Sequence, residues 1–181
     1  MKRPHSSTMT MRATVLFSHG HESSPSSRKI VELAPVAERA GFAVEAIDYR
    51  DLRDDYTGRR DRLVERIDAL DGPVVLAGSS LGGWVSVSAA ERRDALGLWL
   101  TAPALFLEDR VEGGIVPESY APRTERTLIV HGWRDDIISW RHSLRFAEAS
   151  RAQLHLVDDG HRLEHSIPIM QRLFAEFLER L

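Results

Sequence analysis

The sequence predicts an α/β fold: a single domain with a mostly parallel sheet of about six strands and helices on both faces. Six short apolar runs, rich in β-branched residues, have the length of buried strands. The segments between them carry apolar residues at helical spacing. Because parallel strands need crossover connections, and these cover the sheet, the alternation favours helices on both faces.

The apolar runs define the predicted strands, which are residues 13–18, 44–49, 73–78, 97–102, 127–131 and 154–157. Helical spacing is shown by Ile30, Leu33 and Ala37, by Leu63, Ile67 and Leu70, and by Ile167, Met170, Phe174, Leu178 and Leu181.

Three segments depart from the regular alternation of apolar strands and amphipathic helices. Pro35 falls inside the first helical pattern and is expected to kink or split that helix after about two turns. Residues 51–66 mix Arg with Asp and Glu, which predicts a solvated helix face. Between Leu105 and Pro122 the periodicity is interrupted, so a short lid-like excursion is expected there.

Length and composition narrow the classes of function. The 181 residues suit one domain over 12–181, after a flexible leader at 1–11 without the apolar core of a secretory signal. The net charge of -3, with no basic face, argues against nucleic acid, and no apolar run approaches a membrane span of about 18 residues. Without cysteine there is no disulfide or thiolate site, so we expect a cytoplasmic protein. The oligomeric state stays open.

A candidate nucleophile follows the third predicted strand. Ser80 stands between Gly78 and Gly82 in a G-x-S-x-G string, and a small-residue helix is expected to begin near Leu81. A strand-to-helix turn of this kind holds serine in a strained conformation and needs small neighbours. The N-terminus of the helix would offer N–H groups to a developing oxyanion. The alternative is a tight turn in which serines only cap the helix.

A serine nucleophile needs a histidine base and a carboxylate that orients the base. Asp135 follows the fifth predicted strand and His161 follows the sixth. The carboxyl ends of parallel strands share one edge of the sheet, and the chain order Ser80, Asp135, His161 is that of one hydrolase fold.

In these strings the sequence resembles the alpha/beta-hydrolase superfamily, in particular small bacterial esterases, from about Ala13 to the C-terminus. The resemblance implies that Asp135 of the H-G-x-x-D segment is the acid and that His161 of the G-H pair is the base. Residues 19–25 look like an H-G-x-x-S-S-P oxyanion loop, which implies that the N–H groups of His21 and Leu81 form the oxyanion hole. Glu22 departs from the pattern, since many relatives carry an apolar or neutral residue around this position. A carboxylate beside an oxyanion hole is electrostatically unfavourable unless it points away.

Several histidines and carboxylates have other interpretations. Asp136 could replace Asp135 as the acid, whereas Asp158 and Asp159 are expected in loops and turns. His19 is expected to brace its loop by hydrogen bonds, and His155 to be an ordinary strand residue.

Residues 161–165 also read as H-x-x-E-H, a zinc-protease signature when it lies on a helix. Gly160 indicates that His161 lies in a loop, and the sixteen residues after His165 cannot fold back to supply a third ligand. Residues 19–22 could supply an upstream ligand, but a zinc site leaves Ser80 and Asp135 unexplained. A metal-free site is therefore expected, with no cofactor. A non-catalytic relative that binds a ligand or acts as a scaffold is the other alternative.

The sequence thus predicts a serine hydrolase that cleaves a small ester-type substrate, either a carboxylester or a thioester, through an acyl-enzyme on Ser80. Candidates for the apolar walls of the substrate site are Leu105, Phe106, Trp133 and Ile137, although each could equally be ordinary core packing.

Overall fold

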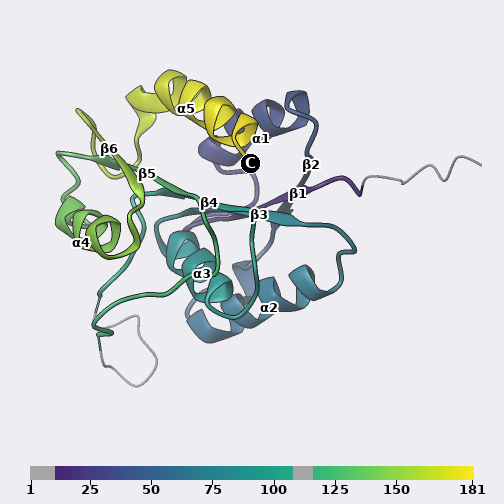
Figure 1. The fold of residues 1–181 in the computed structure, drawn as a ribbon. Coiled ribbons are helices and arrows are strands. Elements are labelled where there is room, and N and C mark those ends of the chain that lie inside the picture. Colours follow the sequence, from purple (N-terminus) through teal and green to yellow (C-terminus); the bar gives the residue numbers. More distant parts are fainter. Residues whose placement is uncertain (1–10, 108–115) are drawn as a thin grey trace, which may run out of the picture.

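The computed structural model describes residues 11–107 and 116–181, and within them it has the predicted α/β fold (Figure 1). The strands are β1 (Thr14–Ser18), β2 (Ala43–Ile47), β3 (Val74–Ser79), β4 (Gly97–Thr101), β5 (Thr127–Gly132) and β6 (Gln153–Val157). The helices are α1 (Arg28–Arg39), α2 (Tyr56–Asp68), α3 (Leu81–Ala90), α4 (Trp140–Ser150) and α5 (Ile167–Glu179), with short 3-10 turns η1 (Arg50–Leu52) and η4 (Glu164–Ser166).

The strands form one sheet in the order β2-β1-β3-β4-β5-β6, and all five pairings are parallel. The single-domain fold with about six strands, predicted from the apolar runs, is confirmed. Both ends of every predicted strand lie within two residues of the ends of an observed strand. In a parallel sheet the carboxyl ends of all strands meet at one edge, so the loops after β1, β3, β4, β5 and β6 can share a site.

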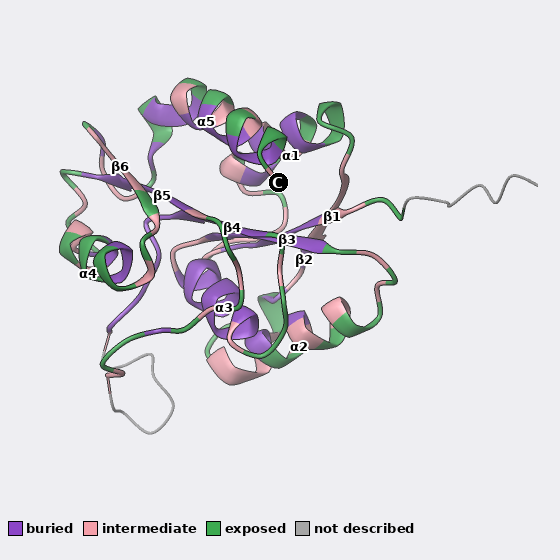
Figure 2. Ribbon diagram, in the orientation of Figure 1, coloured by how far each residue is buried: buried purple, intermediate pink, exposed green. Residues whose placement is uncertain are grey.

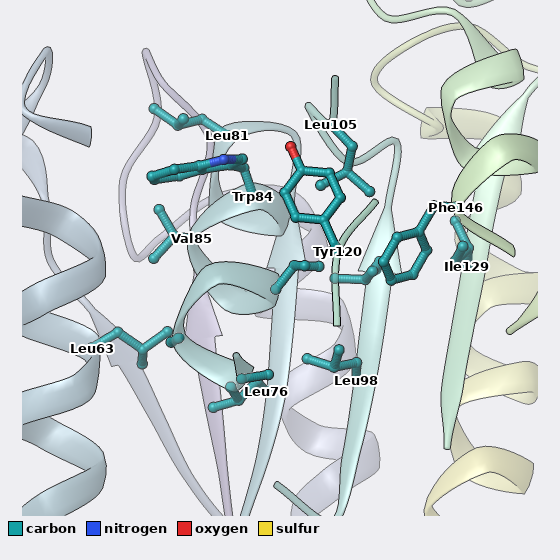
Figure 3. Packing of buried hydrophobic residues seen from close by; sticks show 14 of the residues in the cluster. Leu63, Leu76, Leu81, Trp84, Val85, Leu98, Leu105, Tyr120, Ile129 and Phe146 are labelled. Carbon is teal, nitrogen blue, oxygen red and sulfur yellow. The ribbon is translucent and has the colours of Figure 1, made fainter. Parts of the chain in front are cut away.

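Helices cover both faces of the sheet, as expected. Helices α1 and α5 pack together on one face, and α2 and α3 pack together on the other (Figure 1). The first face is filled by residues such as Phe17, Trp99 and Phe174. The second contains Leu76, Trp84, Leu98 and Phe146, the last of which comes from α4 (Figure 3). All ten residues of α3 are buried, which matches its small and apolar composition (Figure 2).

Two expectations about helices are corrected. Helix α1 runs without a break from Arg28 to Arg39 through Pro35, so the predicted split is wrong. Proline removes the hydrogen bond to the carbonyl four residues earlier, which is that of Val31. Val31 is 56% exposed, so water can solvate this carbonyl and the helix can continue.

The predicted solvated face of residues 51–66 is also wrong in part. Arg59 is fully buried in α2 and Arg60 is 7% exposed. Charge patterning identifies a helix surface, but the loop after β1 packs over this part of α2 and removes Arg59 from water.

The leader at residues 1–10 and the centre of the excursion at 108–115 lie outside the described residues. The ends of the excursion are packed, with the rings of Phe106 and Tyr120 in an edge contact at 5.0 Å between centroids. No helix in the described part of the chain is long and apolar enough to cross a membrane.

Candidate active site

Ser80 lies at the sharp turn between β3 and α3. Its backbone has φ 53° and ψ −118°, a strained conformation for a residue with a side chain. The turn is fixed by main-chain hydrogen bonds, from the N–H of Ser80 to the carbonyl of Thr101 (3.0 Å) and from the N–H of Ala104 to the carbonyl of Ser80 (2.9 Å). Ser80 occupies the N-cap position, but its side chain makes no capping hydrogen bond, so the cap interpretation does not account for it.

The imidazole of His161 lies between Ser80 and Asp135. Its Nε2 is 3.1 Å from Oγ of Ser80, and its Nδ1 is 2.8 Å from Oδ2 of Asp135. With the proton on Nδ1, the ring donates to the carboxylate and can accept the hydroxyl proton of Ser80. Three side chains that follow three different strands therefore form one hydrogen-bonded chain. The neighbouring Asp136 is exposed.

The carboxylate of Asp135 is fully buried and accepts four hydrogen bonds. Oδ1 receives the main-chain N–H groups of Ile137 (2.9 Å) and Ile138 (2.8 Å). Oδ2 receives His161 and also His131, whose Nε2 lies 2.9 Å away. All four lone-pair positions of the carboxylate are thus satisfied, and its orientation is fixed.

Burial alone would raise the pKa of Asp135. The hydrogen bonds from His131, His161, Ile138 and Ile137 outweigh this and hold the pKa well below its usual range. The carboxylate is therefore ionised at neutral pH, which is the form that can orient and stabilise a protonated imidazole.

His131 extends this network into the core. Its side chain is fully buried, its Nε2 also lies 2.9 Å from the carbonyl oxygen of Ile138, and its Nδ1 is 2.7 Å from Oγ of Ser143 in α4. Because Nε2 faces two acceptors, it carries a proton. The ring thereby links the carboxylate to α4.

The loop after β1 passes beside Ser80. A β-carbon on Gly20 would lie 3.6 Å from Cβ of Ser80. His19 is buried, with Nδ1 2.8 Å from the carbonyl oxygen of Gly20 and Nε2 accepting the N–H of Tyr49 at 3.0 Å. The expectation that His19 braces its loop by hydrogen bonds is confirmed.

The side chains of His21 and Glu22 turn toward the segment between η1 and α2. Nε2 of His21 is 2.7 Å from Oδ1 of Asp54, and the carboxylate of Glu22 pairs with the guanidinium of Arg53. The side chain of Glu22 is 71% exposed. The carboxylate of Glu22 therefore lies in solvent beside Arg53, which is the outward orientation that the sequence requires of a carboxylate here.

Leu81 begins α3, directly after Ser80. The first N–H groups of a helix have no intrahelical acceptor and lie at the positive end of its dipole. The side chain of Leu81 packs into the core and leaves the N-terminus of the helix at the carboxyl edge of the sheet (Figure 3).

The four predicted wall residues divide into two pairs. Leu105 is fully buried in the core around α3 (Figure 3). Phe106 is 7% exposed and belongs to the same core. Trp133 and Ile137 are 50% and 65% exposed and flank Asp135 in the loop after β5. The ring of Trp133 packs edge-on against Trp140, with 4.9 Å between centroids. Only this second pair presents apolar surface to solvent.

The H-x-x-E-H string does not lie on one continuous helix. His161 is in a turn, Leu163 has a left-handed backbone with φ 55°, and η4 begins only at Glu164. The side chain of His165 is 84% exposed and faces Asp159. Among residues 11–107 and 116–181, no three His, Cys, Asp or Glu side chains are grouped to hold a metal ion.

Asp159 belongs to the loop that carries His161, as expected for a turn residue. Its Oδ1 accepts the N–H of Gly160 at 2.8 Å, and its Oδ2 accepts the N–H of His165 and the hydroxyl of Ser166, both at 2.9 Å. These bonds fix the turn on both sides of His161.

Two residues that hold the candidate site in place could not be identified from the sequence. His131 is part of the H-G-x-x-D string, but that string does not show that its ring reaches Asp135. Arg59 donates to the carbonyls of Gly20 and His21, yet among charged neighbours it has no distinguishing pattern. Its burial is determined by the loop that packs on it and not by its own helix.

Comparison with known proteins identifies the family. Residues 14–125, more than half of the chain, match the Uncharacterised protein family (UPF0227). A protein of the alpha/beta hydrolase superfamily from Xanthomonas campestris pv. campestris is 37% identical, and its structure superposes with a TM-score of 0.81 over 94% of this chain and 99% of that chain. No curated protein sequence matches significantly.

More distant structures share the fold alone. Est1E from Butyrivibrio proteoclasticus is 17% identical, with a TM-score of 0.79 over 94% of this chain and 88% of that one. Mouse alpha/beta hydrolase domain-containing protein 10 is 22% identical, with a TM-score of 0.73 over 92% and 90%. By sequence and by fold, the chain belongs to the family UPF0227 and to the alpha/beta-hydrolase superfamily.

Proposed function

We propose that the chain is a serine hydrolase that cleaves a small ester-type substrate through an acyl-enzyme on Ser80. Membership of the alpha/beta-hydrolase superfamily supports a hydrolase. The observation that carries the finer proposal is the position of His161, whose two ring nitrogens lie 3.1 Å from Oγ of Ser80 and 2.8 Å from Oδ2 of Asp135. This is the contact pattern that a nucleophile, a base and an orienting carboxylate require.

In the proposed reaction, Oγ of Ser80 attacks the acyl carbonyl while Nε2 of His161 takes its proton. The imidazolium is stabilised by the ionised Asp135. Collapse of the tetrahedral intermediate breaks the ester bond, and His161 returns the proton to the leaving alcohol or thiol. Water then attacks the acyl-enzyme with His161 as base again, and releases the acid and free Ser80.

We assign the oxyanion of the intermediate to the main-chain N–H groups of His21 and Leu81. Two observations support this assignment. Leu81 offers the first amide of a ten-residue helix, and the loop runs so close to Ser80 that a β-carbon added at Gly20 would be in van der Waals contact with it. Donors fixed in position before the reaction stabilise a developing charge more than mobile water does.

For the acyl group we propose contact with Trp133 and Ile137, since these apolar side chains are exposed in the same loop as Asp135. Core packing around α3 accounts for the burial of Leu105 and Phe106. Est1E, which shares the fold, has been solved with ferulic acid bound. An aromatic ester such as methyl ferulate therefore belongs in a substrate panel beside simple acyl esters.

The test is active-site labelling with a fluorophosphonate, combined with turnover of p-nitrophenyl acetate. Ser80→Ala should abolish labelling and lower turnover by on the order of 10⁴-fold, because members of a triad act as a unit. Ser79→Ala is the matched control and should keep both. Equal labelling of Ser80→Ala and the unmodified protein would overturn the proposal.

The acid is tested in the same assay. Asp135→Asn should lower kcat by about 10⁴-fold because the amide favours the wrong tautomer of His161. Asp136→Asn, an exposed change one residue away, should keep most activity. The reverse ranking would reassign the acid.

A further inference from the structure

Arg59 is a buried arginine on α2 whose guanidinium binds the loop after β1. Its side chain is fully buried and lies over the ring of Tyr49, 5.5 Å from the centroid. Four of its hydrogen bonds end on main-chain carbonyl oxygens, those of Leu52 (2.8 Å), Gly20 (3.2 Å), His21 (3.1 Å) and Arg53 (3.1 Å). A charge buried away from water is tolerated when such acceptors surround it, so the guanidinium and the loop fix each other.

The carbonyl of Gly20 receives a second donor. Nδ1 of His19 lies 2.8 Å from this oxygen, on a ring whose Nε2 accepts the N–H of Tyr49. Burial is the main cause that lowers the pKa of His19, so the ring is neutral at pH 7 and the Nδ1 proton is the one donated. The Gly20 oxygen is thus held from two sides, by His19 and by Arg59.

The carbonyl of Gly20 and the N–H of His21 belong to the same planar peptide unit and point in opposite directions. A group that fixes the oxygen therefore fixes the direction of the N–H. Donation to the oxygen also polarises the unit and strengthens the N–H as a donor, because hydrogen bonds in series reinforce one another. In the proposed function this N–H donates a hydrogen bond to the oxyanion.

We propose that Arg59, together with His19, is a positioning residue that aims and polarises the Gly20–His21 peptide for the oxyanion. This inference rests on the proposed function. Arg59 does not touch the reacting atoms and acts only through the peptide. The outer contacts of the loop, His21 with Asp54 and Glu22 with Arg53, involve carboxylates that are 75% and 71% exposed. Exposed ion pairs contribute little, so the buried guanidinium dominates.

The experiment uses two substitutions of Arg59 and one matched control. Arg59→Met removes the charge and the hydrogen bonds, whereas Arg59→Lys keeps the charge and loses the two-pronged geometry. Arg62→Met is the control, since Arg62 lies one turn further along α2 and binds Asp48 and Asp51. Arg59→Lys is the decisive variant if Arg59→Met fails to fold.

Both Arg59 variants should lose about 10- to 100-fold in kcat on p-nitrophenyl acetate with little change in KM, because a misdirected oxyanion donor affects the transition state and not substrate binding. Affinity for a small alkyl boronic acid, which forms a tetrahedral adduct on serine, should fall by the same factor. Arg62→Met should change neither quantity.

A second readout does not depend on turnover. In ¹⁵N-labelled protein, the amide proton of His21 should shift upfield in the Arg59 variants, since its peptide is less polarised, and should stay in place in Arg62→Met. A folded Arg59→Lys protein with unchanged kcat and unchanged His21 amide would overturn the inference. If Ser80→Ala is inactive but Arg59→Lys shows no change in kcat or in the His21 amide, the role proposed for Arg59 is wrong and the proposed function stands. If Ser80→Ala is fully active, the proposed function itself fails.

Discussion

His131 and His161 donate to the same oxygen atom, Oδ2 of Asp135, from distances of 2.9 and 2.8 Å. The two rings approach from opposite environments, since His131 is fully buried and the side chain of His161 is 16% exposed. The buried ring therefore holds the carboxylate in place for the accessible one. His131 is in turn held by Ser143 of α4, so the alignment of His161 depends on a helix that does not contribute to the reaction.

We predict that His131→Phe lowers kcat by about 10- to 100-fold, which corresponds to the loss of one hydrogen bond to a charged group. His131→Gln, which keeps an N–H donor, should recover part of this loss. The measurement is steady-state kinetics on p-nitrophenyl acetate, with His155→Phe on β6 as a control for replacing a strand histidine. Equal activity of His131→Phe and His155→Phe would show that His131 only fills space.

The ionised Asp135 predicts how stability depends on pH. The pKa of Asp135 is depressed in the folded protein, so its stabilising contribution is complete above the ordinary pKa of an aspartate, about 4, and is lost as the pH falls toward the folded value. The difference in Tm between the unmodified protein and Asp135→Asn should be largest near pH 7 and should shrink toward pH 3. Thermal unfolding at several pH values measures it.

Asp136→Asn is the control for this series, because the exposed carboxylate should give a small difference at every pH. Other aspartates with a lowered pKa, such as Asp48 and Asp159, are present in both proteins and cancel from the comparison. A difference for Asp135→Asn that grows at low pH would contradict the assignment of an ionised carboxylate.

Gly82 is predicted to be essential for folding. A β-carbon at this position would lie 1.9 Å from the carbonyl oxygen of Ser18 in β1, closer than any nonbonded contact, and the obstructing atom is main chain. Gly82→Ala should therefore cost more than about 3 kcal/mol in the free energy of unfolding, or prevent soluble expression. Urea denaturation measures the cost. Gly160→Ala, where a β-carbon meets nothing within 4 Å, should change stability by less than about 1 kcal/mol.

The substrate prediction concerns acyl chain length. The excursion after β4 has about eighteen residues, with Gly113, Gly114 and Pro117 among them, which is too short for a multi-helix lid. An added methylene contributes up to about 0.8 kcal/mol only while it becomes buried, so kcat/KM should peak at short acyl chains. Esters from acetate to palmitate test this. A steady rise to palmitate would indicate a deeper pocket than Trp133 and Ile137 provide.

The strands could be predicted within two residues because strands buried on both faces are continuous apolar runs, as in Val74–Ser79. The sharp turn at Ser80 was predictable for a similar reason. Gly78 and Gly82 flank it where main-chain atoms leave no room for a β-carbon, and this requirement is visible as sequence.

Other features depend on contacts between distant segments and leave no local pattern. Arg59 is buried and Arg62 is not, because the loop after β1 packs over Arg59. His21 in that loop is 38 residues earlier in the chain than Arg59. Helix α1 continues through Pro35 with Val31 exposed to water one turn earlier, and that exposure follows from how the helix lies on the sheet. Asp135 and Asp136 are adjacent in the loop after β5, and the direction of the chain in that turn decides that Asp135 contacts His161.

The position of β6 at the border of the sheet has a consequence for how the protein loses activity. β6 pairs only with β5 in the described sheet, and the loop after it carries His161. That loop is tied to the loop of Asp135 by main-chain hydrogen bonds from Trp133 to Val157 (2.9 Å) and from Arg134 to Asp159 (3.0 Å). A local opening of β6 would therefore carry His161 away from Ser80 and Asp135 while β1, β3 and β4 stay intact. Amide hydrogen exchange should then be faster in β6 than in β3. As denaturant is added, activity should be lost together with the protection of the β6 amides and before the protein unfolds globally.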